Sequence, residues 1–381
     1  MPTIKQYVFK KAAAKRVPVS GTFELTSRCN LNCRMCYIRM TEEEQRLQGR
    51  ELTTDEWLSV GRQAVDAGMI YLLLTGGEPM IRPDFITIYS EMVKMGVLVS
   101  VNTNACAVTP EIVDCFRQYR PETVNVTIYG SSEETYRSLC GSSAGFINAL
   151  RGIRMLKDAG IRLTLNTTFT SLNLHDMEEL VAFAKEMELP IRTAAYVFPK
   201  VRNGMDKQTV SLAPEQHARA AAKFDLLTMD PDIIIGKRNI VRKILNGDVD
   251  VSAPTGSKAS SCMAGRGAFW VCWDGKIYPC GMLPDDRFNV RETAFRDCWS
   301  AISEKMPSIF LPAECSSCRF SPICPVCAAL AQSLGGDTTA VPTAMCRYIE
   351  TYAREILRLT EGIEASAEHQ TYESDGFNCI L

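Results

Sequence analysis

Six short runs rich in β-branched and aromatic residues alternate with helical patterns between residues 21 and 197 of this 381-residue chain. The predicted strands are residues 22–25, 71–74, 98–101, 123–128, 162–169 and 191–197. The stretches between them place apolar residues three and four positions apart, and Gly68, Gly96 and Gly160 follow three of these stretches, as C-cap glycines do. Strands that alternate with helices predict a parallel sheet with right-handed crossovers. Because six units are too few to close an eight-stranded barrel, we expect an α/β fold with a partial (β/α)6 barrel.

The composition is typical of a globular protein in water and excludes several classes of function. Apolar residues make up 46% of the chain and charged residues 23%. The formal charge of −2 and the pI near 6.1 argue against nucleic acid as a partner. No apolar run approaches the roughly 20 residues of a membrane span. The basic N-terminus, predicted as a solvated arm, lacks the apolar core of a signal peptide. We therefore expect a cytoplasmic protein that binds neither nucleic acid nor a membrane.

Sixteen cysteines are many for a chain without a secretory signal. A disulfide framework is not expected in a reducing compartment, so their clustering indicates metal. Cys29, Cys33 and Cys36 stand at offsets of four and three after the first predicted strand, where barrels place their chemistry. Three thiolates on one loop can hold three irons of a 4Fe–4S cluster. The fourth iron is then open to a ligand that is not protein, as in catalytic metal sites. A zinc loop is the alternative.

A second motif, Gly76-Gly77-Glu78-Pro79, ends the second predicted strand. Two glycines let the backbone approach a ligand closely, and a carboxylate such as that of Glu78 accepts hydrogen bonds from a ligand ammonium group. An ordinary glycine turn is the alternative. The two motifs follow neighbouring strands, so we expect them to lie together at one edge of the sheet.

Nine of the cysteines fall between residues 262 and 346, in a segment with few long apolar elements. Such a segment buries little apolar surface and is expected to be held together by metal. Asp274-Gly275 is a hairpin signal between residues 269–273 and 276–278. A pair of zinc sites is the alternative here. The predicted divisions are an arm at 1–20, the barrel at 21–210, a helical bridge and linker at 211–260, a small Cys-rich domain with a β-hairpin at 261–347, and a helix and tail at 348–381.

The cysteine loop resembles the Cys-x3-Cys-x2-Cys signature of the radical SAM superfamily, with Tyr37 as the aromatic residue that commonly follows. The Gly-Gly-Glu-Pro motif matches that family in type and position. The resemblance implies a TIM-like barrel in which S-adenosylmethionine (SAM) chelates the open iron. One electron then cleaves SAM to methionine and a 5′-deoxyadenosyl radical, which abstracts hydrogen from a substrate. The residues it assigns to SAM are Tyr37, Gly76, Gly77, Glu78, Pro79, Asn102, Asn104, Thr127 and Asn166.

One position departs from the family. Many relatives carry an arginine after the fourth strand that meets the SAM carboxylate. In this chain Arg137 is not clearly at that spacing, and Cys140 occupies the neighbourhood instead.

The C-terminal cysteines resemble the seven-cysteine SPASM domain, which binds two auxiliary 4Fe–4S clusters. The usual three residues between the last pair of the central group are two here, between Cys324 and Cys327. The resemblance implies three clusters in total. It assigns Cys262, Cys280 and Cys327 to the first auxiliary cluster and Cys315, Cys318, Cys324 and Cys346 to the second. Either Cys272 completes the first set or one iron stays open for a substrate thiolate, and Cys272 is then a buried structural thiol.

The resemblance implies a peptide- or protein-modifying oxidoreductase, most simply a maturase that forms a thioether or carbon–carbon crosslink in a ribosomally made peptide. It identifies no catalytic side chain. A flavodoxin- or ferredoxin-like electron donor is expected as a partner. Because the barrel begins by residue 21, leader recognition is expected to use a separate protein or the barrel itself. The alternatives are a peptide epimerase, a zinc-rich interaction module, and a formylglycine-generating sulfatase-maturing enzyme, whose aspartate base is replaced here by Gly281.

Overall fold

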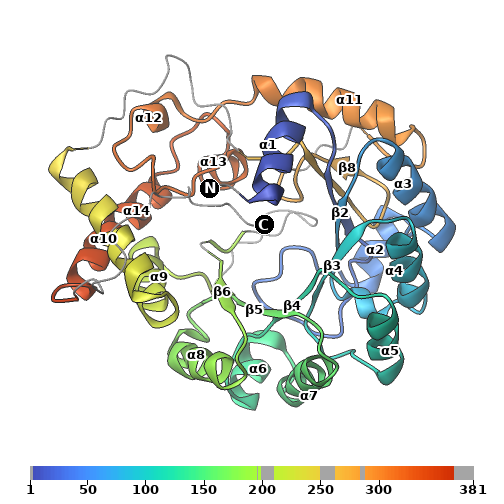
Figure 1. The fold of residues 1–381 in the computed structure, drawn as a ribbon, viewed down its shortest axis with the longest axis horizontal. Helices are drawn as coiled ribbons and strands as arrows, with labels where there is room; N and C mark the ends of the chain where they lie inside the picture. The colour runs from blue at the N-terminus through green and yellow to red at the C-terminus, as the bar shows by residue number, and fades with distance from the viewer. Residues whose placement is uncertain (1–2, 195, 199–209, 249–261, 284–287, 364–381) are drawn as a thin grey trace.

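An eight-stranded sheet organises the protein (Figure 1), whose computed structural model describes residues 3–194, 196–198, 210–248, 262–283 and 288–363. The strand order is β6-β5-β4-β3-β2-β1-β7-β8. The strands are β1 (Ser20–Glu24), β2 (Tyr71–Thr75), β3 (Leu98–Thr103), β4 (Thr123–Thr127), β5 (Leu163–Thr167), β6 (Ile191–Thr193), β7 (Ala268–Val271) and β8 (Ile277–Tyr278). Strands β1 to β6 pair in parallel in chain order, which confirms the predicted partial barrel.

All six predicted strands are present, with ends that differ by a few residues. The largest difference is at β6, which ends at Thr193 and is shorter than the predicted 191–197, and β5 is also shorter than the predicted 162–169. After β5, the Asn173 side chain makes hydrogen bonds with backbone groups that a neighbouring strand would otherwise satisfy. Its carbonyl oxygen accepts from the backbone N–H of Thr170, and its amide donates to the Thr168 carbonyl. A side chain that satisfies backbone groups in this way ends a strand.

The predicted hairpin joins the barrel sheet. Strand β7 pairs in parallel with β1, and β8 returns antiparallel to β7. Phe269 of β7 lies 6.4 Å from Phe23 of β1, centroid to centroid, so the hairpin shares the barrel core. Without β7, strand β1 would be an exposed edge with unpaired backbone groups. The Cys-rich segment is thereby fixed to the barrel through backbone hydrogen bonds.

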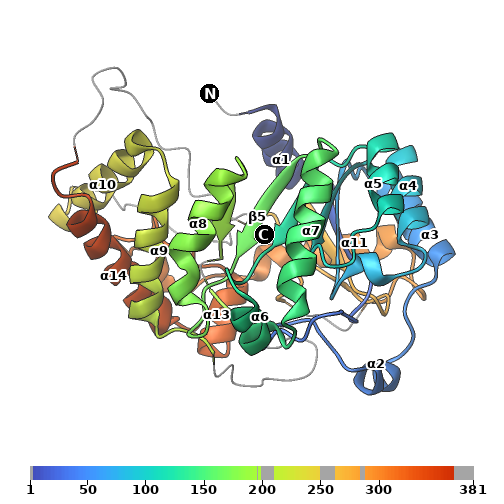
Figure 2. The ribbon, with the colours of Figure 1, turned by 90° about the horizontal axis from the view of Figure 1, so that it is seen from below.

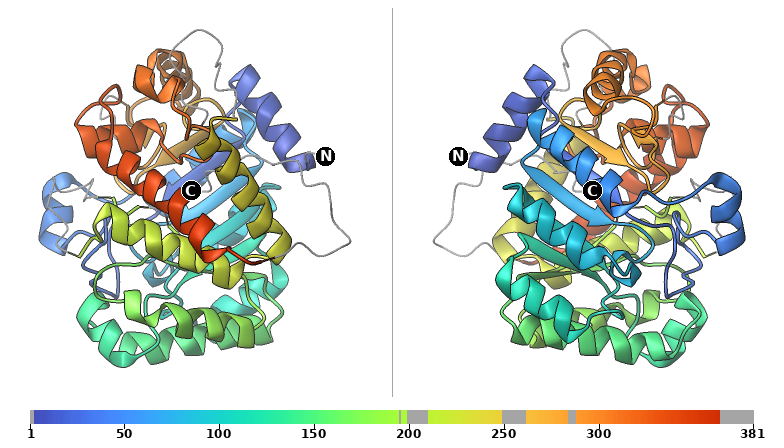
Figure 3. Two further views of the ribbon diagram at one scale, coloured as in Figure 1. Left: turned by 90° about the vertical axis from the view of Figure 1, so that its left-hand side faces the viewer. Right: turned by 90° about the vertical axis from the view of Figure 1, so that its right-hand side faces the viewer.

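Helices cover the outer side of the curved sheet, and a second helical group packs beside it (Figures 1 and 3). The α-helices are α1 (Ile4–Lys15), α2 (Glu42–Gln48), α3 (Thr54–Asp66), α4 (Phe85–Lys94), α5 (Pro110–Gln118), α6 (Glu133–Cys140), α7 (Ala144–Asp158), α8 (Met177–Glu186), α9 (Pro214–Thr228), α10 (Pro231–Asn246), α11 (Phe295–Lys305), α12 (Ala313–Ser316), α13 (Ala328–Gly335) and α14 (Thr343–Leu359). Three short 3-10 helices are η1 (Pro79–Ile81), η2 (Leu174–Asp176) and η3 (Met306–Ser308).

The two faces of the sheet differ in polarity. Phe23, Leu74, Val101, Val126 and Leu165 belong to the main hydrophobic core under the helices. Because successive residues of a strand point to opposite faces, their neighbours line the inside of the barrel. These inner-face residues include Thr22, Ser100, Asn102, Asn125, Thr127, Thr164 and Asn166. Leu73 and Trp270, the register partners of Thr22, lie on the same face. The barrel interior is therefore mostly polar, unlike the packed apolar layers of a closed barrel.

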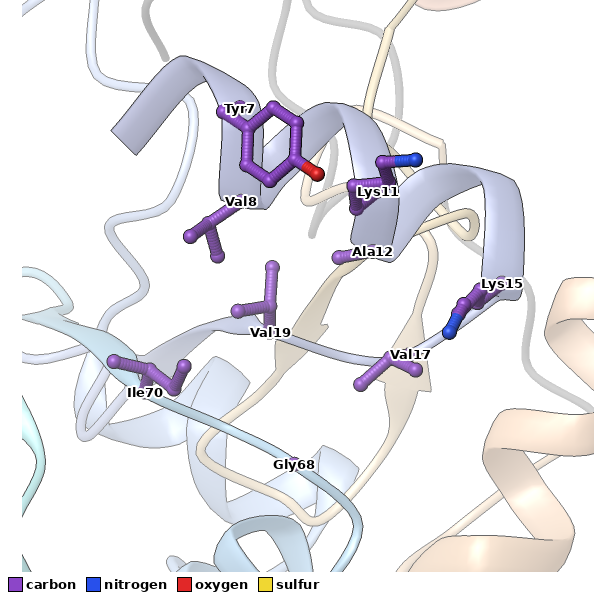
Figure 4. A pocket seen from close by; sticks show the side chains of 9 residues that line it. All are labelled: Tyr7, Val8, Lys11, Ala12, Lys15, Val17, Val19, Gly68 and Ile70. Carbon is purple, nitrogen blue, oxygen red and sulfur yellow. The ribbon is translucent and has the colours of Figure 1, made fainter. Parts of the chain in front are cut away.

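The basic N-terminal segment forms a helix whose basic side chains, Lys10, Lys11, Lys15 and Arg16, are exposed to solvent. Helix α1 begins with a capping box between Thr3 and Gln6. The Phe9 ring lies 5.3 Å from that of Tyr71, centroid to centroid, and Ala12 is buried. A groove of about 450 Å³ lies under α1 at the amino ends of β1 and β2 (Figure 4), lined by Tyr7, Val8, Lys11, Ala12, Lys15, Val17, Val19, Gly68 and Ile70.

Among the described residues, no helix combines the length and the apolarity needed to cross a bilayer. The predicted linker at 252–261 and the tail from residue 364 lie outside the described residues.

We predict that Gly152→Ala destabilises the protein. A Cβ at this position of α7 would lie 2.1 Å from the Ala105 carbonyl oxygen, a backbone atom that cannot rotate away. Overpacking of this kind costs about 1–3 kcal/mol. Denaturant unfolding of the anaerobically purified protein measures the change. The matched control is Gly236→Ala on α10, where a Cβ would meet nothing within 4 Å; it should stabilise by roughly 0.5–1 kcal/mol. Equal effects of the two substitutions would contradict the packing argument.

Candidate active site

The three cysteines of the N-terminal loop lie at the carboxyl end of β1. This loop leads to α2, at the opposite end of the barrel from α1 (Figure 2). Backbone N–H groups point at two of the sulfurs: Leu31 N lies 3.4 Å from Cys29 Sγ, and Arg39 N lies 3.2 Å from Cys36 Sγ. Burial raises the pKa of both thiols, and the charges of the other loop cysteines add to this. Metal ions that bind here must displace protons, as is usual for thiolate ligands.

The Gly-Gly-Glu-Pro turn packs directly on the start of this loop. Gly77 N donates to Thr26 O at 2.7 Å, and Glu78 N donates to Arg28 O at 2.9 Å. A Cβ on Gly77 would lie 2.1 Å from Arg28 O, and one on Gly76 2.5 Å from Thr26 O. The glycines thus allow two backbones to touch, and their predicted close approach to a ligand stays a prediction. The ends of β1 and β2 form one rigid platform.

Glu78 is a fully buried carboxylate within this platform. Its Oε1 accepts from Met80 N at 3.1 Å and from the Thr103 hydroxyl at 2.8 Å, and its Oε2 accepts from Asn104 N at 2.7 Å. Burial raises its pKa to about 7 against these stabilising bonds. Two carboxylate oxygens offer about four acceptor sites, so three donors leave capacity for a further one. A ligand ammonium group would favour the ionised form.

The other residues assigned to SAM divide into two groups. Asn104 holds the cysteine loop, because its amide nitrogen lies 2.7 Å from Asn30 Oδ1 and 3.6 Å from Cys29 Sγ. Asn102, Thr127 and Asn166 line the inner face of adjacent strands. Asn102 accepts a hydrogen bond from Asn125 at 2.9 Å, and Thr127 and Asn166 are register partners. The inner-face group could contact a ligand over the sheet.

A network of charged side chains packs against the start of the cysteine loop. Sequence patterns did not predict it. Glu51 accepts from Arg28 Nε and Nη2, each at 3.0 Å, and from the Thr26 hydroxyl. Arg82, nearly buried, donates to Glu51 at 3.0 Å, to Leu25 O at 2.9 Å and to Asp84 at 2.7 Å. Glu51 and Arg82 belong to no motif with a recognisable spacing, so only the folded chain shows their role. Removing one partner of a buried pair costs about 3–5 kcal/mol.

Arg137 lies away from the loop. It pairs with Glu134 on the same helix, and its side chain is 59% exposed. Cys140 instead neighbours the cysteine loop. Its thiol hydrogen-bonds with that of Cys33, and its carbonyl oxygen accepts from Asn32 N at 2.8 Å. The C-terminal end of α6 therefore holds the middle of the cysteine loop.

Two groups of cysteines form in the C-terminal segment. Burial raises the pKa of Cys324 to about 12, and the charges of Cys315, Cys318 and Cys346 raise it further. These three thiols therefore lie within electrostatic range of Cys324. Cys262, Cys280 and Cys327 pack at one small hydrophobic cluster, and Cys327 also packs, with Cys318 and Cys324, against another. The division into two ligand sets stays a prediction.

Cys272 packs in a different hydrophobic cluster from Cys262, Cys280 and Cys327. It is buried with Trp270 and Tyr278, against Cys36 and Tyr37. Its Sγ lies 3.8 Å from Oε2 of the fully buried Glu24, which also accepts from Trp270 Nε1 at 2.9 Å. Tyr37 contacts this cluster and also the one around Cys262, Cys280 and Cys327. It therefore lies between the N-terminal loop and the Cys-rich segment.

The residues fit iron–sulfur clusters by the chemistry of their donors. The loop offers three thiols within mutual electrostatic range, together with N–H groups aimed at sulfur, which are the bonds that tune such clusters. Among the described residues, no three His, Cys, Asp or Glu side chains converge closely enough to share a single metal ion. A four-iron cluster spreads its ligands around a larger body.

Comparison with known proteins agrees with the motifs. Residues 23–184 match the radical SAM superfamily model. The chain is 30% identical over 339 residues to an AdoMet-dependent heme synthase of Methanosarcina barkeri, covering 85% of this chain and 95% of that protein. It is 26% identical to a PqqA peptide cyclase of Ruegeria pomeroyi, covering 87% of each.

The fold is similar to that of solved enzymes. A structure of anSMEcpe with bound AdoMet and Kp18Cys peptide superposes with a TM-score of 0.64 at 16% identity, covering 90% of this chain and 96% of that one. The family model, the heme synthase relative and the shared fold lead to one conclusion: the chain belongs to the radical SAM superfamily and is an enzyme of that class.

Proposed function

We propose that this enzyme carries three 4Fe–4S clusters and oxidises a peptide by hydrogen abstraction. Membership of the superfamily gives it SAM and one 4Fe–4S cluster. Cys29, Cys33 and Cys36 hold that cluster, and the two C-terminal groups hold one auxiliary cluster each. Cys272 is a buried structural thiol in this proposal, which is supported by its place beside Glu24 and in a different hydrophobic cluster from Cys262, Cys280 and Cys327.

When bound, the cluster and SAM supply a 5′-deoxyadenosyl radical that removes hydrogen from carbon. The protein positions the reactants and excludes water. Glu78 is placed to accept a hydrogen bond from the ammonium group of SAM. Asn104 and the backbone N–H groups of Leu31 and Arg39 orient the cysteine sulfurs.

The polarity of the inner face carries the proposal of a peptide substrate. Its strand residues are mainly Ser, Thr and Asn, which donate to and accept from amides. Among the described strands, Arg192 is the one cation of this face and Glu24 the one carboxylate. A peptide backbone matches such a surface. The PqqA peptide cyclase relative and the peptide-bound anSMEcpe structure support the same class of substrate.

Crosslink formation is favoured over formylglycine formation by the packing of Gly281. A Cβ at this position would lie 2.8 Å from the Trp270 ring, so an aspartate there would displace the indole that bonds to Glu24. The site has no room for the base that the sulfatase-maturing type places after Tyr278-Pro279-Cys280. We propose a thioether or carbon–carbon crosslink, with a ferredoxin- or flavodoxin-like donor supplying the first electron.

A tetrapyrrole is the second candidate substrate. The motifs did not predict it, and it is favoured by the 30% identity to a heme synthase over 95% of that protein. Against it stands the inner face, because the several carboxylates of an iron porphyrin would call for more cations than Arg192 alone.

We predict that the cysteine sets can be separated by iron content. Anaerobically reconstituted wild-type protein should hold about 12 irons, four for each cluster. Joint replacement of Cys29, Cys33 and Cys36 by Ala should remove about four irons and abolish 5′-deoxyadenosine formation. Cys315→Ala with Cys318→Ala should remove a different set of about four. Cys272→Ala should lose none, and Cys115→Ala, on the outer helix α5, is the matched control. Loss of iron from Cys272→Ala would assign it to a cluster.

We predict that a peptide encoded beside the gene donates the hydrogen. The enzyme, SAM and a strong reductant are incubated anaerobically with the deuterated peptide, and 5′-deoxyadenosine is examined by mass spectrometry. Deuterium should appear in it, and the peptide should lose two hydrogens as the crosslink forms.

Iron coproporphyrin serves as the parallel substrate. If the enzyme converts iron coproporphyrin and leaves the peptide unchanged, its substrate is a tetrapyrrole and not a peptide. Unchanged peptide mass with uptake of solvent deuterium would indicate epimerisation and contradict crosslinking.

A further inference from the structure

Arg39 presents an unused donor beside the cysteine loop. Its backbone N–H donates to Cys36 Sγ at 3.2 Å, which fixes the residue next to that sulfur. Its side-chain Nε is buried and has no acceptor in the part of the chain that the structure describes. Buried donors without a partner are rare in folded proteins and call for an explanation.

The other arginines near this end of the barrel either pair with a carboxylate or are exposed to solvent. Arg28 and Arg82 are paired with Glu51 and Asp84 below the loop. Arg137 pairs with Glu134 on the outer side of α6, and Arg34 is exposed. Arg39 is therefore the cation beside the loop whose charge is not neutralised by a carboxylate in the described chain.

The charge of Arg39 acts on the cysteine sulfurs. Burial raises the pKa of Cys36 and a hydrogen bond with Cys140 raises that of Cys33, and in both thiols the Arg39 guanidinium works in the opposite direction. The guanidinium thus lies within electrostatic range of both. Glu78 lies close enough to raise the pKa of Cys29. It is a further source of negative charge beside the cysteine loop.

A reducible centre at this place accumulates negative charge. Three thiolates already surround it, and each added electron makes the site more negative. A nearby cation and N–H donors to sulfur both stabilise the reduced form, and the effect is large where the surroundings are dry. An arginine is suited to this because it keeps its charge when buried and donates through a rigid fork.

We propose that Arg39 is a positioning residue for the SAM-binding cluster: its Nε–H donates to a sulfur at the Cys33 and Cys36 side, and its charge raises the reduction potential of the cluster. The inference rests on the cluster assignment made under the proposed function. Arg39 touches no substrate in this role; it sets how readily the cluster accepts the electron.

The test is a reductive titration of the full-length, anaerobically reconstituted protein, followed by electron paramagnetic resonance. The SAM-binding cluster is identified by the change in its signal when SAM is added. We expect Arg39→Gln to shift the midpoint potential of that cluster to more negative values, and Arg39→Lys, which keeps the charge without Nε, to fall between this variant and wild type. Arg137→Gln is the matched control and should leave the potential unchanged, because its side chain is exposed on α6.

Two results would overturn the inference. The first is an unchanged midpoint potential in Arg39→Gln with normal iron content. The second is weaker SAM binding at an unchanged potential, which would place Arg39 against the SAM carboxylate. If Arg39→Gln fails to fold or to retain iron, Arg39→Lys decides between the same outcomes. A wild-type protein without any SAM-sensitive cluster signal would instead refute the cluster assignment itself.

Discussion

The contact between two backbone turns is the constraint on which the site depends. Gly77 and Glu78 donate their N–H groups to carbonyls of the Thr26–Arg28 stretch, and no side chain fits between them. This contact joins the end of β1 to the end of β2. Because the cysteine loop begins directly after one turn and Glu78 lies in the other, the loop cysteines and a buried carboxylate receive a fixed spacing. The Glu51 network then holds the same turn from the opposite side.

Strand β1 also connects the barrel to the Cys-rich segment. It has a parallel neighbour on each side, β2 and β7, so the end of β7 reaches the same edge of the sheet. This brings Trp270 and Cys272 beside Glu24, and Tyr37 between the loop and the C-terminal cysteines. The Cys-rich segment thereby gains a defined position. Its buried residues Phe269, Phe295 and Trp299 join the barrel core, so apolar packing adds to the backbone pairing.

The division of the sheet into an apolar outer face and a polar inner face links the fold to the chemistry. The outer residues pack under helices and stabilise the barrel. The inner residues present uncharged hydrogen-bond donors and acceptors to the inside of the barrel. The relatives include both a heme synthase and a peptide cyclase, so the family by itself does not distinguish between the two substrates. The proposal of a peptide rests on the polarity of the inner face.

Local patterns in the sequence were sufficient to predict the features that depend on near neighbours: six strands with their helices, the cysteine loop at Cys29–Cys36, the glycine motif after β2 and the hairpin at Asp274-Gly275. Spacing and periodicity are sufficient there because the chemistry is local. The folded chain was needed to show that β7 extends the barrel, that Asn104 holds Cys29, that Cys272 faces Glu24 and that the buried Arg39 Nε has no acceptor among the described residues. The bond between Trp270 and Glu24 spans 246 residues. A contact at such a distance leaves no pattern in the intervening sequence, since it is set by how strands pair.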